Sequence, residues 1–86
     1  MSTRKNTENR PRALVTGAAG GLGREIAAQL AARGCAVAVA DINAVGSGET
    51  SGLVRAHGVD VLEIAGDFTQ EGAPEAAVQK VVSSWG

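Results

Sequence analysis

Short runs of consecutive apolar residues alternate along the chain with longer stretches in which apolar residues recur at helical spacing. Residues 12–16 and 35–41 each contain such a run, and neither run alternates between apolar and polar positions. Unbroken apolar runs are typical of parallel strands that are covered on both faces. The run over residues 59–65, VDVLEIA, alternates more, which indicates a strand nearer the edge of a sheet.

Helices are expected in the remaining stretches, over residues 21–33, 47–57 and 73–85. Each stretch contains apolar side chains three or four positions apart, which is the spacing of residues on one helix face. The expected buried faces consist of Leu22, Ile26 and Leu30 in the first helix, Leu53, Val54 and His57 in the second, and Val78, Val81, Val82 and Trp85 in the third.

The order strand, helix, strand, helix, strand, helix predicts an α/β fold of the Rossmann type, a doubly wound parallel sheet with strand order 3-2-1. Right-handed crossovers should place the first two helices on one face of the sheet and the third on the other. A fourth strand would be expected beside the first, and the sequence ends before it. We therefore expect an incomplete sheet, from a truncated chain or an incomplete gene product, or one that a partner completes.

Composition narrows the classes of protein that remain. The net charge of −1 argues against a nucleic-acid-binding protein. No run approaches the roughly 20 apolar residues of a membrane span, and no secretory signal is visible, so we expect a cytoplasmic protein. Cys35 is the single cysteine, which excludes an internal disulfide and fits a reducing compartment. His57 is the single histidine and has no acidic cluster around it, so no metal site is expected.

The main signal for chemistry is the stretch TGAAGGLG at residues 16–23, which joins the first strand to the first helix. A glycine-rich turn before a helix directs backbone N–H groups and the positive end of the helix dipole at one point, where a phosphate can bind. Glycine allows positive φ and leaves the backbone open to a pyrophosphate. We expect the N–H groups of residues 20–23 to donate to a pyrophosphate and the Thr16 hydroxyl to order the turn.

Asp41 ends the second strand, close to the spacing of about 20 residues at which a dinucleotide-binding fold has an acid after its glycine loop. Its carboxylate is expected to accept hydrogen bonds from the ribose hydroxyls of the adenosine half. A carboxylate repels a 2′-phosphate, so NAD is expected in preference to NADP. Arg24 follows the loop closely and could reach a phosphate, which would favour NADP. The alternative interpretation is a connecting turn and a solvated acid that bind nothing.

These residues resemble the short-chain dehydrogenase/reductase family. Thr16-Gly17-x-x-x-Gly21-x-Gly23 matches the TGxxxGxG cofactor loop of that family, and the continuation GLGREIAAQLAARGCAVAVADIN is similar to its dehydrogenase branch. The same loop also fits the glycine spacing of the extended, epimerase-like branch. The resemblance implies a partial NAD(P)-binding Rossmann domain over residues 12–86. Residues 1–11 show no apolar periodicity and end in proline, so we expect a disordered basic tail there.

The resemblance also implies an adenine contact. Asp67 and Phe68 stand in a segment that is similar to the one lying along the adenine ring in the family. Asp67 and Thr69 are also good N-cap residues for the following helix, and both roles can hold together. The full set of candidate cofactor-binding residues is Thr16, Gly17, Gly20, Gly21, Leu22, Gly23, Asp41, Ile42, Asp67 and Phe68.

The catalytic groups of the family are missing, because the sequence contains no tyrosine and so no Tyr-x-x-x-Lys motif. We assign no catalytic residue. The resemblance implies an N-terminal fragment of an NAD(P)-dependent oxidoreductase that transfers hydride to or from an alcohol or carbonyl substrate. That substrate would bind only if the chain continues, and a full-length protein could form a homo-oligomer. The alternatives are a stand-alone nucleotide-binding module and a non-functional remnant without catalysis.

Overall fold

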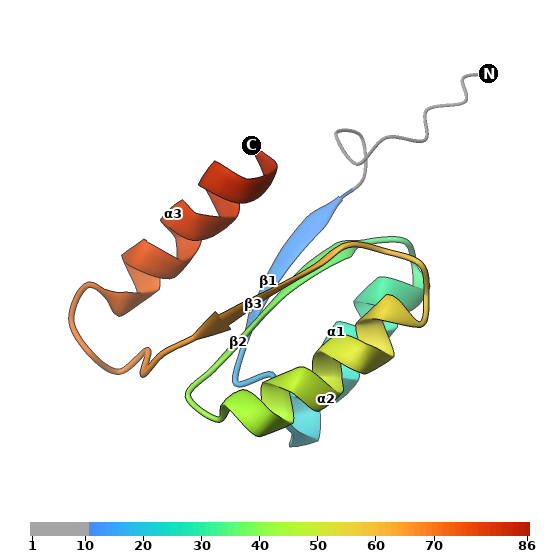
Figure 1. Ribbon diagram of the computed structural model, residues 1–86, viewed down its shortest axis with the longest axis horizontal. Coiled ribbons are helices and arrows are strands. Elements are labelled where there is room, and N and C mark those ends of the chain that lie inside the picture. Colours follow the sequence, from blue (N-terminus) through green and yellow to red (C-terminus); the bar gives the residue numbers. More distant parts are fainter. Residues whose placement is uncertain (1–10) are drawn as a thin grey trace.

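The computed structural model describes residues 11–86, in which strands and helices alternate (Figure 1). The elements are β1 (Arg12–Thr16), α1 (Gly21–Ala32), β2 (Ala36–Asp41), α2 (Ala44–Arg55), β3 (Val61–Ala65) and α3 (Ala73–Trp85). This alternation is the one that the sequence predicts. The tail expected over residues 1–11 lies, apart from Pro11, outside the described residues.

The sheet is parallel, with β2 between β1 and β3, which confirms the predicted strand order 3-2-1. Thr16 pairs with Ala40, and Asp41 pairs with Ala65, so the carboxyl ends of the strands meet at one edge of the sheet. Helices α1 and α2 lie on one face and α3 lies on the other, as expected from right-handed crossovers (Figure 1). Within residues 11–86, β1 is paired on one side only.

Strand β2 separates two apolar clusters, because its side chains alternate between the faces of the sheet. Val37 and Val39 belong to the cluster under α1 and α2, whereas Ala38 and Ala40 belong to the cluster under α3. All four side chains are fully buried. Burial on both faces explains why this strand is an unbroken apolar run in the sequence.

Helix α1 buries a different face from the one predicted. Leu22 is 75% exposed and Ile26 is 42% exposed, and of the expected stripe only Leu30 packs against the core. The buried residues of α1 are Ala27 and Ala31. The prediction was wrong because it followed the large side chains, whereas the small alanine face lets the helix lie close to the sheet.

Helix α2 starts earlier than predicted and also turns a different face inward. The Asn43 side chain accepts a hydrogen bond from the Gly46 N–H at 3.0 Å and so caps a helix that begins at Ala44, three residues before the predicted start. Val54 is buried as predicted, but Leu53 is 46% exposed and His57 is exposed beyond the end of the helix. The inward face consists of small and polar residues, namely Gly46, Ser47, Thr50 and Ser51, together with Val54.

Helix α3 has the predicted bounds and half of the predicted buried stripe. Val81 and Trp85 pack against the cluster that contains Ile64, and Ala77 is a buried member of the same cluster. Val78 and Val82 are about half exposed, which corrects the prediction for those two residues.

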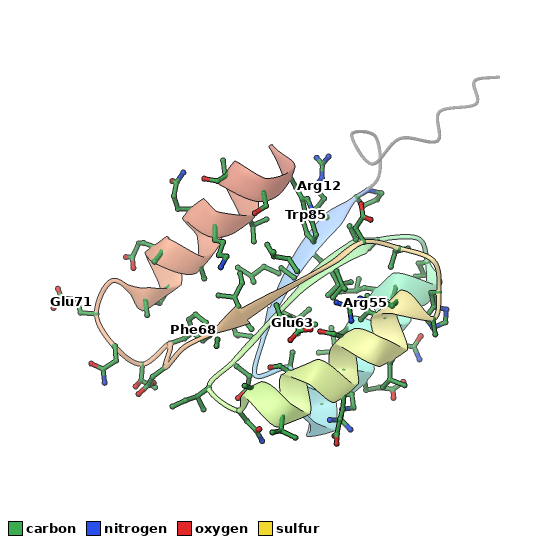
Figure 2. All side chains as sticks on the ribbon, viewed as in Figure 1. Arg12, Arg55, Glu63, Phe68, Glu71 and Trp85 are labelled. Atoms are coloured by element: carbon green, nitrogen blue, oxygen red, sulfur yellow. The ribbon has the colours of Figure 1, made fainter. Side chains whose placement is uncertain are left out.

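Strand β3 begins two residues later than predicted and has the mixed character of a strand at the sheet edge. Ile64 is buried and Glu63 is exposed, as the alternation predicts. The Glu63 carboxylate lies 3.7 Å from the Arg55 guanidinium at the end of α2 (Figure 2). This ion pair is solvent-exposed, so its contribution to stability is small.

Candidate functional site

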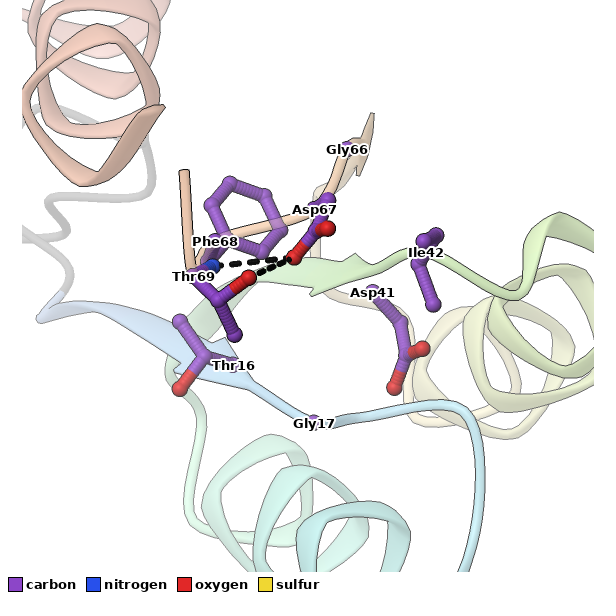
Figure 3. A pocket seen from close by; sticks show the side chains of 8 residues that line it. All are labelled: Thr16, Gly17, Asp41, Ile42, Gly66, Asp67, Phe68 and Thr69. Atoms are coloured by element: carbon purple, nitrogen blue, oxygen red, sulfur yellow. Dashed lines mark hydrogen bonds between the residues drawn. The ribbon is translucent and has the colours of Figure 1, made fainter. Parts of the chain in front are cut away.

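A pocket of about 310 Å³ lies at the edge of the sheet where the carboxyl ends of the strands meet. In an open α/β sheet, this edge is where ligands bind. Figure 3 shows the residues that line it, which are Thr16, Gly17, Asp41, Ile42, Gly66, Asp67, Phe68 and Thr69. The structure thus brings together residues from the ends of all three strands, which are far apart in the sequence.

The glycine loop forms one wall of this edge, and its glycines have different structural roles. Gly17 and Gly21 have φ values of +65° and +56°, a left-handed conformation that favours glycine. A Cβ atom at Gly23 would overlap the carbonyl group of Gly17, so this position has no room for a side chain. Gly20 is extended, and a Cβ atom there would meet nothing within 4 Å. The fold of residues 11–86 would therefore accommodate a side chain at position 20.

The start of α1 is open to an anion. Gly20 is the N-cap residue, and within residues 11–86 no side chain caps the helix and no acid stands in its first turn. The N–H groups of Gly21, Leu22 and Gly23 belong to the helix turn whose donors have no intrahelical acceptor. An uncapped N-terminus with open space in front of it suits a phosphate. These three residues and Gly20 are not among the residues that line the pocket.

Asp41 lies between the glycine loop and the start of α2, with both carboxylate oxygens held. Its Oδ2 accepts a hydrogen bond from the Ala19 N–H at 3.0 Å, and its Oδ1 accepts one from the Asn43 N–H at 2.9 Å. The Asn43 N–H and then the Ala19 N–H hold the pKa of the Asp41 carboxyl below its ordinary value of 3.8. Asp41 is therefore a fixed negative charge at neutral pH.

The segment after β3 closes the opposite side of the pocket. Asp67 Oδ1 accepts hydrogen bonds from the Thr69 N–H at 3.0 Å and from the Thr69 hydroxyl at 2.6 Å (Figure 3). The Thr69 hydroxyl is the main reason that the pKa of Asp67 lies below its ordinary value. Asp67 therefore closes a turn of its own and does not cap α3, whose N-cap is Gly72 with φ of +85°. This corrects the capping role considered for Asp67 and Thr69.

The apolar side chains of the pocket come from opposite walls. The Phe68 ring packs against the cluster under α3 and lies 3.6 Å from where a Cβ atom of Gly66 would stand. Ile42 is 68% exposed at the end of β2 (Figure 3). A flat apolar group could be contacted from both sides here. The Thr16 hydroxyl, by contrast, makes no hydrogen bond to the turn within residues 11–86, although the residue lines the pocket.

Arg24 connects the glycine loop to α2. The sequence analysis missed this role and considered Arg24 only as a phosphate contact. Its Nε donates to Thr50 Oγ1 at 3.0 Å, and its Nη2 donates to the carbonyl oxygen of Ala19 and to that of Gly46 at 3.2 Å. Nη2 also lies 2.9 Å from a carboxylate oxygen of Glu49. A basic residue immediately after the glycine loop was the available signal, but its partners on α2 become evident only in three dimensions.

Other kinds of site are not seen in the described part of the chain. No group of three or more His, Cys, Asp or Glu side chains there could hold a metal ion. Helices long and apolar enough to cross a membrane are likewise not found among residues 11–86.

A three-stranded parallel sheet with a glycine loop after β1 and an acid at the end of β2 defines the Rossmann class of folds. The family model described as short chain dehydrogenase matches residues 11–86. The chain belongs to the short-chain dehydrogenase family, as the N-terminal part of its fold.

Similar proteins agree with this membership. The 3-oxoacyl-(acyl-carrier-protein) reductase FabG of Staphylococcus aureus is 42% identical over 78 residues, which cover 86% of this chain and 30% of that protein. A crystal structure of NAD+-bound xylitol dehydrogenase matches 96% of this chain and 31% of its own, with 32% identity and a TM-score of 0.83. Carveol dehydrogenase from Mycobacterium avium in complex with NAD matches 87% of this chain and 31% of its own, at 25% identity and a TM-score of 0.81.

The extent of these matches is itself a finding. The chain spans about 30% of the length of the curated relatives that it matches. The match to the family model, over residues 11–86, includes the glycine loop, the acid at the end of β2 and the segment after β3. The parts of those relatives beyond this region have no counterpart among the 86 residues.

Proposed function

We propose that this chain binds NAD at the carboxyl edge of its sheet, as the cofactor-binding part of a short-chain oxidoreductase. The observation that carries the proposal is the Asp41 carboxylate, held by the N–H groups of Ala19 and Asn43 at the rim of the pocket. It stands where the loop, the end of β2 and the pocket adjoin. A dinucleotide needs these three features together, since its phosphates, ribose and base are linked.

The pyrophosphate is proposed to bind at the start of α1. The N–H groups of Gly21, Leu22 and Gly23 would donate to its oxygens, and the positive end of the helix dipole favours its charge. Support comes from the open space in front of Gly20 and from the lack of a capping side chain within residues 11–86. A methyl group at Gly20 would occupy space that the phosphate needs.

The adenosine ribose is proposed to bind at Asp41, whose carboxylate would accept hydrogen bonds from the ribose hydroxyls. Each carboxylate oxygen can accept more than one hydrogen bond, so the bonds from Ala19 and Asn43 leave acceptor capacity for the ribose. The same negative charge would repel the 2′-phosphate of NADP, which supports NAD as the preferred cofactor.

The adenine ring is proposed to lie between the walls of the pocket. Ile42 would contact one side of it, and Phe68 would contribute an apolar surface from the segment after β3. The Asp67 turn would position that segment, because the Thr69 N–H and hydroxyl hold its carboxylate.

Hydride transfer to or from an alcohol or carbonyl is the reaction that family membership supports for a longer protein containing this chain. When bound, the cofactor supplies the hydride acceptor in its oxidised form, NAD+, or the hydride donor in its reduced form, NADH. The 86 residues contribute binding and orientation, and their sequence contains no tyrosine to serve as the acid or base of the family. For such a longer protein we also propose a homo-oligomer and a cytoplasmic location.

Calorimetric titration of the 86-residue chain with NAD and with NADP tests the proposal. Saturable binding of one NAD per chain, with weaker binding of NADP, is expected. Binding of neither dinucleotide by a folded chain would overturn the proposal. Equal affinity for both would leave dinucleotide binding in place and overturn the preference for NAD.

A further inference from the structure

The side chains of Arg24 and Thr50, here termed the loop clamp, connect the glycine loop to α2. Thr50 lies on the inward face of α2 and is fully buried. Its hydroxyl accepts a hydrogen bond from Arg24 Nε at 3.0 Å and donates one to the carbonyl oxygen of Ala18 at 2.6 Å. The hydroxyl thus uses both its donor and its acceptor capacity within the fold.

The loop clamp completes a set of bonds around two consecutive loop residues. The Ala18 N–H donates to the Ala40 carbonyl at 3.3 Å, and the Ala19 N–H donates to Asp41 at 3.0 Å. The Ala18 carbonyl accepts from Thr50, and the Ala19 carbonyl accepts from Arg24. Every backbone polar group of Ala18 and Ala19 therefore has a partner, and half of those partners belong to the loop clamp.

Helix α2 also approaches the loop too closely for the clamp to be a loose surface contact. A Cβ atom at Gly46 would lie 2.6 Å from the Ala19 carbonyl oxygen. Ala18 is fully buried beneath this contact. The segment immediately before Gly20 is therefore fixed in direction by side chains and by close packing.

The charge of Arg24 is balanced by an acidic side chain of α2 at the protein surface. Its guanidinium pairs with Glu49 at 2.9 Å, and its other partners are the neutral oxygen atoms of Thr50, Ala19 and Gly46. A planar guanidinium can serve several such acceptors at once, which a lysine ammonium on its flexible stem cannot reproduce. These contacts favour a role in shaping the loop over a role as a phosphate ligand.

We propose that Arg24 and Thr50 are positioning residues of the dinucleotide site. They hold the Ala18–Ala19 segment against α2, aim the Ala19 N–H at Asp41, and so set the loop N–H groups for the pyrophosphate. The effect on NAD rests on the proposed function, whereas the effect on the loop does not. Two measurements on the full 86-residue chain keep these apart.

The first measurement follows the Ala19 amide by NMR as a function of pH without any ligand. In the unaltered chain, its chemical shift should follow the titration of Asp41. The amplitude of that response should fall by at least half in Arg24→Met and Thr50→Val. It should persist in Thr50→Ser, which keeps the hydroxyl, and in Arg33→Met, which removes an exposed arginine just after α1. An unchanged response in Arg24→Met and Thr50→Val would overturn the loop clamp.

The second measurement is the dissociation constant for NAD itself. It should rise about tenfold in Arg24→Met and Thr50→Val, the loss expected for one hydrogen bond to a charged group. Arg24→Lys should show nearly the same loss, whereas Thr50→Ser and Arg33→Met should stay within about twofold of the unaltered chain. Full rescue by lysine would overturn the proposal, because it would make Arg24 a simple charge for the phosphate.

Two further outcomes are also decisive. If the unaltered chain does not bind NAD, the proposed function fails, and the pH response of Ala19 still decides whether the clamp fixes the loop. If Thr50→Val loses its dispersed amide spectrum, Arg24→Lys and Thr50→Ser supply the comparison. A normal Ala19 response in Arg24→Lys would then overturn the proposal that the several hydrogen bonds of the Arg24 guanidinium position the loop.

Discussion

The Oδ2 atom of Asp41 accepts a hydrogen bond from the backbone N–H of Ala19 at 3.0 Å, although the two residues are 22 positions apart in the chain. Ala19 belongs to the glycine loop after β1, and Asp41 ends β2, the neighbouring strand. The bond joins the proposed phosphate and ribose contacts directly. A change at Asp41 should therefore alter both the choice of cofactor and the geometry of the loop.

Replacement of Asp41 by asparagine should weaken NAD binding and reduce the preference for NAD over NADP. The amide keeps the shape of the side chain but loses the charge that repels a 2′-phosphate. We expect the dissociation constant for NAD to rise about tenfold, as for the loss of a hydrogen bond to a charged group. The constant for NADP should rise less or fall. Parallel titrations with the two dinucleotides measure the ratio.

Asp60→Asn is the matched control, because Asp60 is exposed just before β3, at the opposite end of the strands from the pocket. It should change neither constant. A ratio of NAD to NADP affinity that stays the same in Asp41→Asn would contradict the proposed role of the charge.

Stability should fall in acid as Asp41 becomes protonated. The N–H groups of Asn43 and Ala19 make the pKa of Asp41 lower in the folded than in the unfolded chain. Such a carboxylate contributes stability above its unfolded pKa, and that contribution is lost as the pH falls through the folded pKa. The free energy of unfolding should therefore decrease below about pH 4.

Carbon NMR of the Asp41 carboxyl group measures this titration at the residue itself, which matters because the pKa of Asp67 is lowered as well. The midpoint should lie below the ordinary value of 3.8. In Asp41→Asn, part of the acid sensitivity of unfolding should disappear. A midpoint at or above the ordinary value would show that the two N–H bonds are not formed in solution.

Gly23→Ala should lower the stability of the fold, whereas Gly20→Ala should leave stability nearly unchanged and weaken NAD binding. Gly23→Ala places a Cβ atom on the Gly17 carbonyl and should cost about 1–3 kcal/mol of stability, as overpacking does. Gly20→Ala meets nothing within 4 Å. At this N-cap position, the poorer cap and the smaller unfolded-state entropy oppose each other, each within about 1 kcal/mol.

Gly20→Ala should nonetheless weaken NAD binding, because its methyl group occupies the proposed approach of the pyrophosphate. Thermal unfolding and NAD titration of both variants separate the two roles. If Gly20→Ala binds NAD as well as the unaltered chain does, the pyrophosphate does not lie where we propose.

Valine-to-alanine changes at Val54 and Val82 test which side of each helix supports the fold. Val54 is fully buried, so Val54→Ala should lower the free energy of unfolding by about 2 kcal/mol. Val82 is 51% exposed on α3, so Val82→Ala should cost only a few tenths of that amount. Urea unfolding followed by far-ultraviolet circular dichroism, which reports on all the helices and strands, measures both losses. Equal losses would mean that Val82 is buried in solution.

The elements could be predicted from the sequence because each rests on a local signal, and the strand order then followed from the order of the elements along the chain. The unbroken apolar run at β2 indicates a strand covered on both faces, and the structure places it in the centre of the sheet. The buried faces of the helices were harder to predict. Helix α1 contains one face with Leu22 and Ile26 and another with Ala27 and Ala31, and the size of the side chains favoured the wrong one.

The candidate site likewise has one part that could be predicted from the sequence and one part that could not. Asp41 and the glycine loop stand out because their spacing along the chain is characteristic, and the structure brings them together. The contacts of Arg24 with Thr50 join residues 26 positions apart on two different helices. No periodicity or motif specifies such a pairing, because it depends on how closely α2 packs against the loop.

Helix α3 is held to the sheet by one narrow face, whereas α1 and α2 pack against each other as well as against the sheet (Figure 1). Regions with fewer buried apolar contacts open at a lower free energy than the rest of a protein. Amide protons of α3 should therefore exchange with deuterated solvent through local opening. Those of β2, which is bonded on both edges and buried on both faces, should exchange only when the whole sheet unfolds. The glycine loop, anchored to the strands and to α2, would survive the detachment of α3 as part of the slowly exchanging unit.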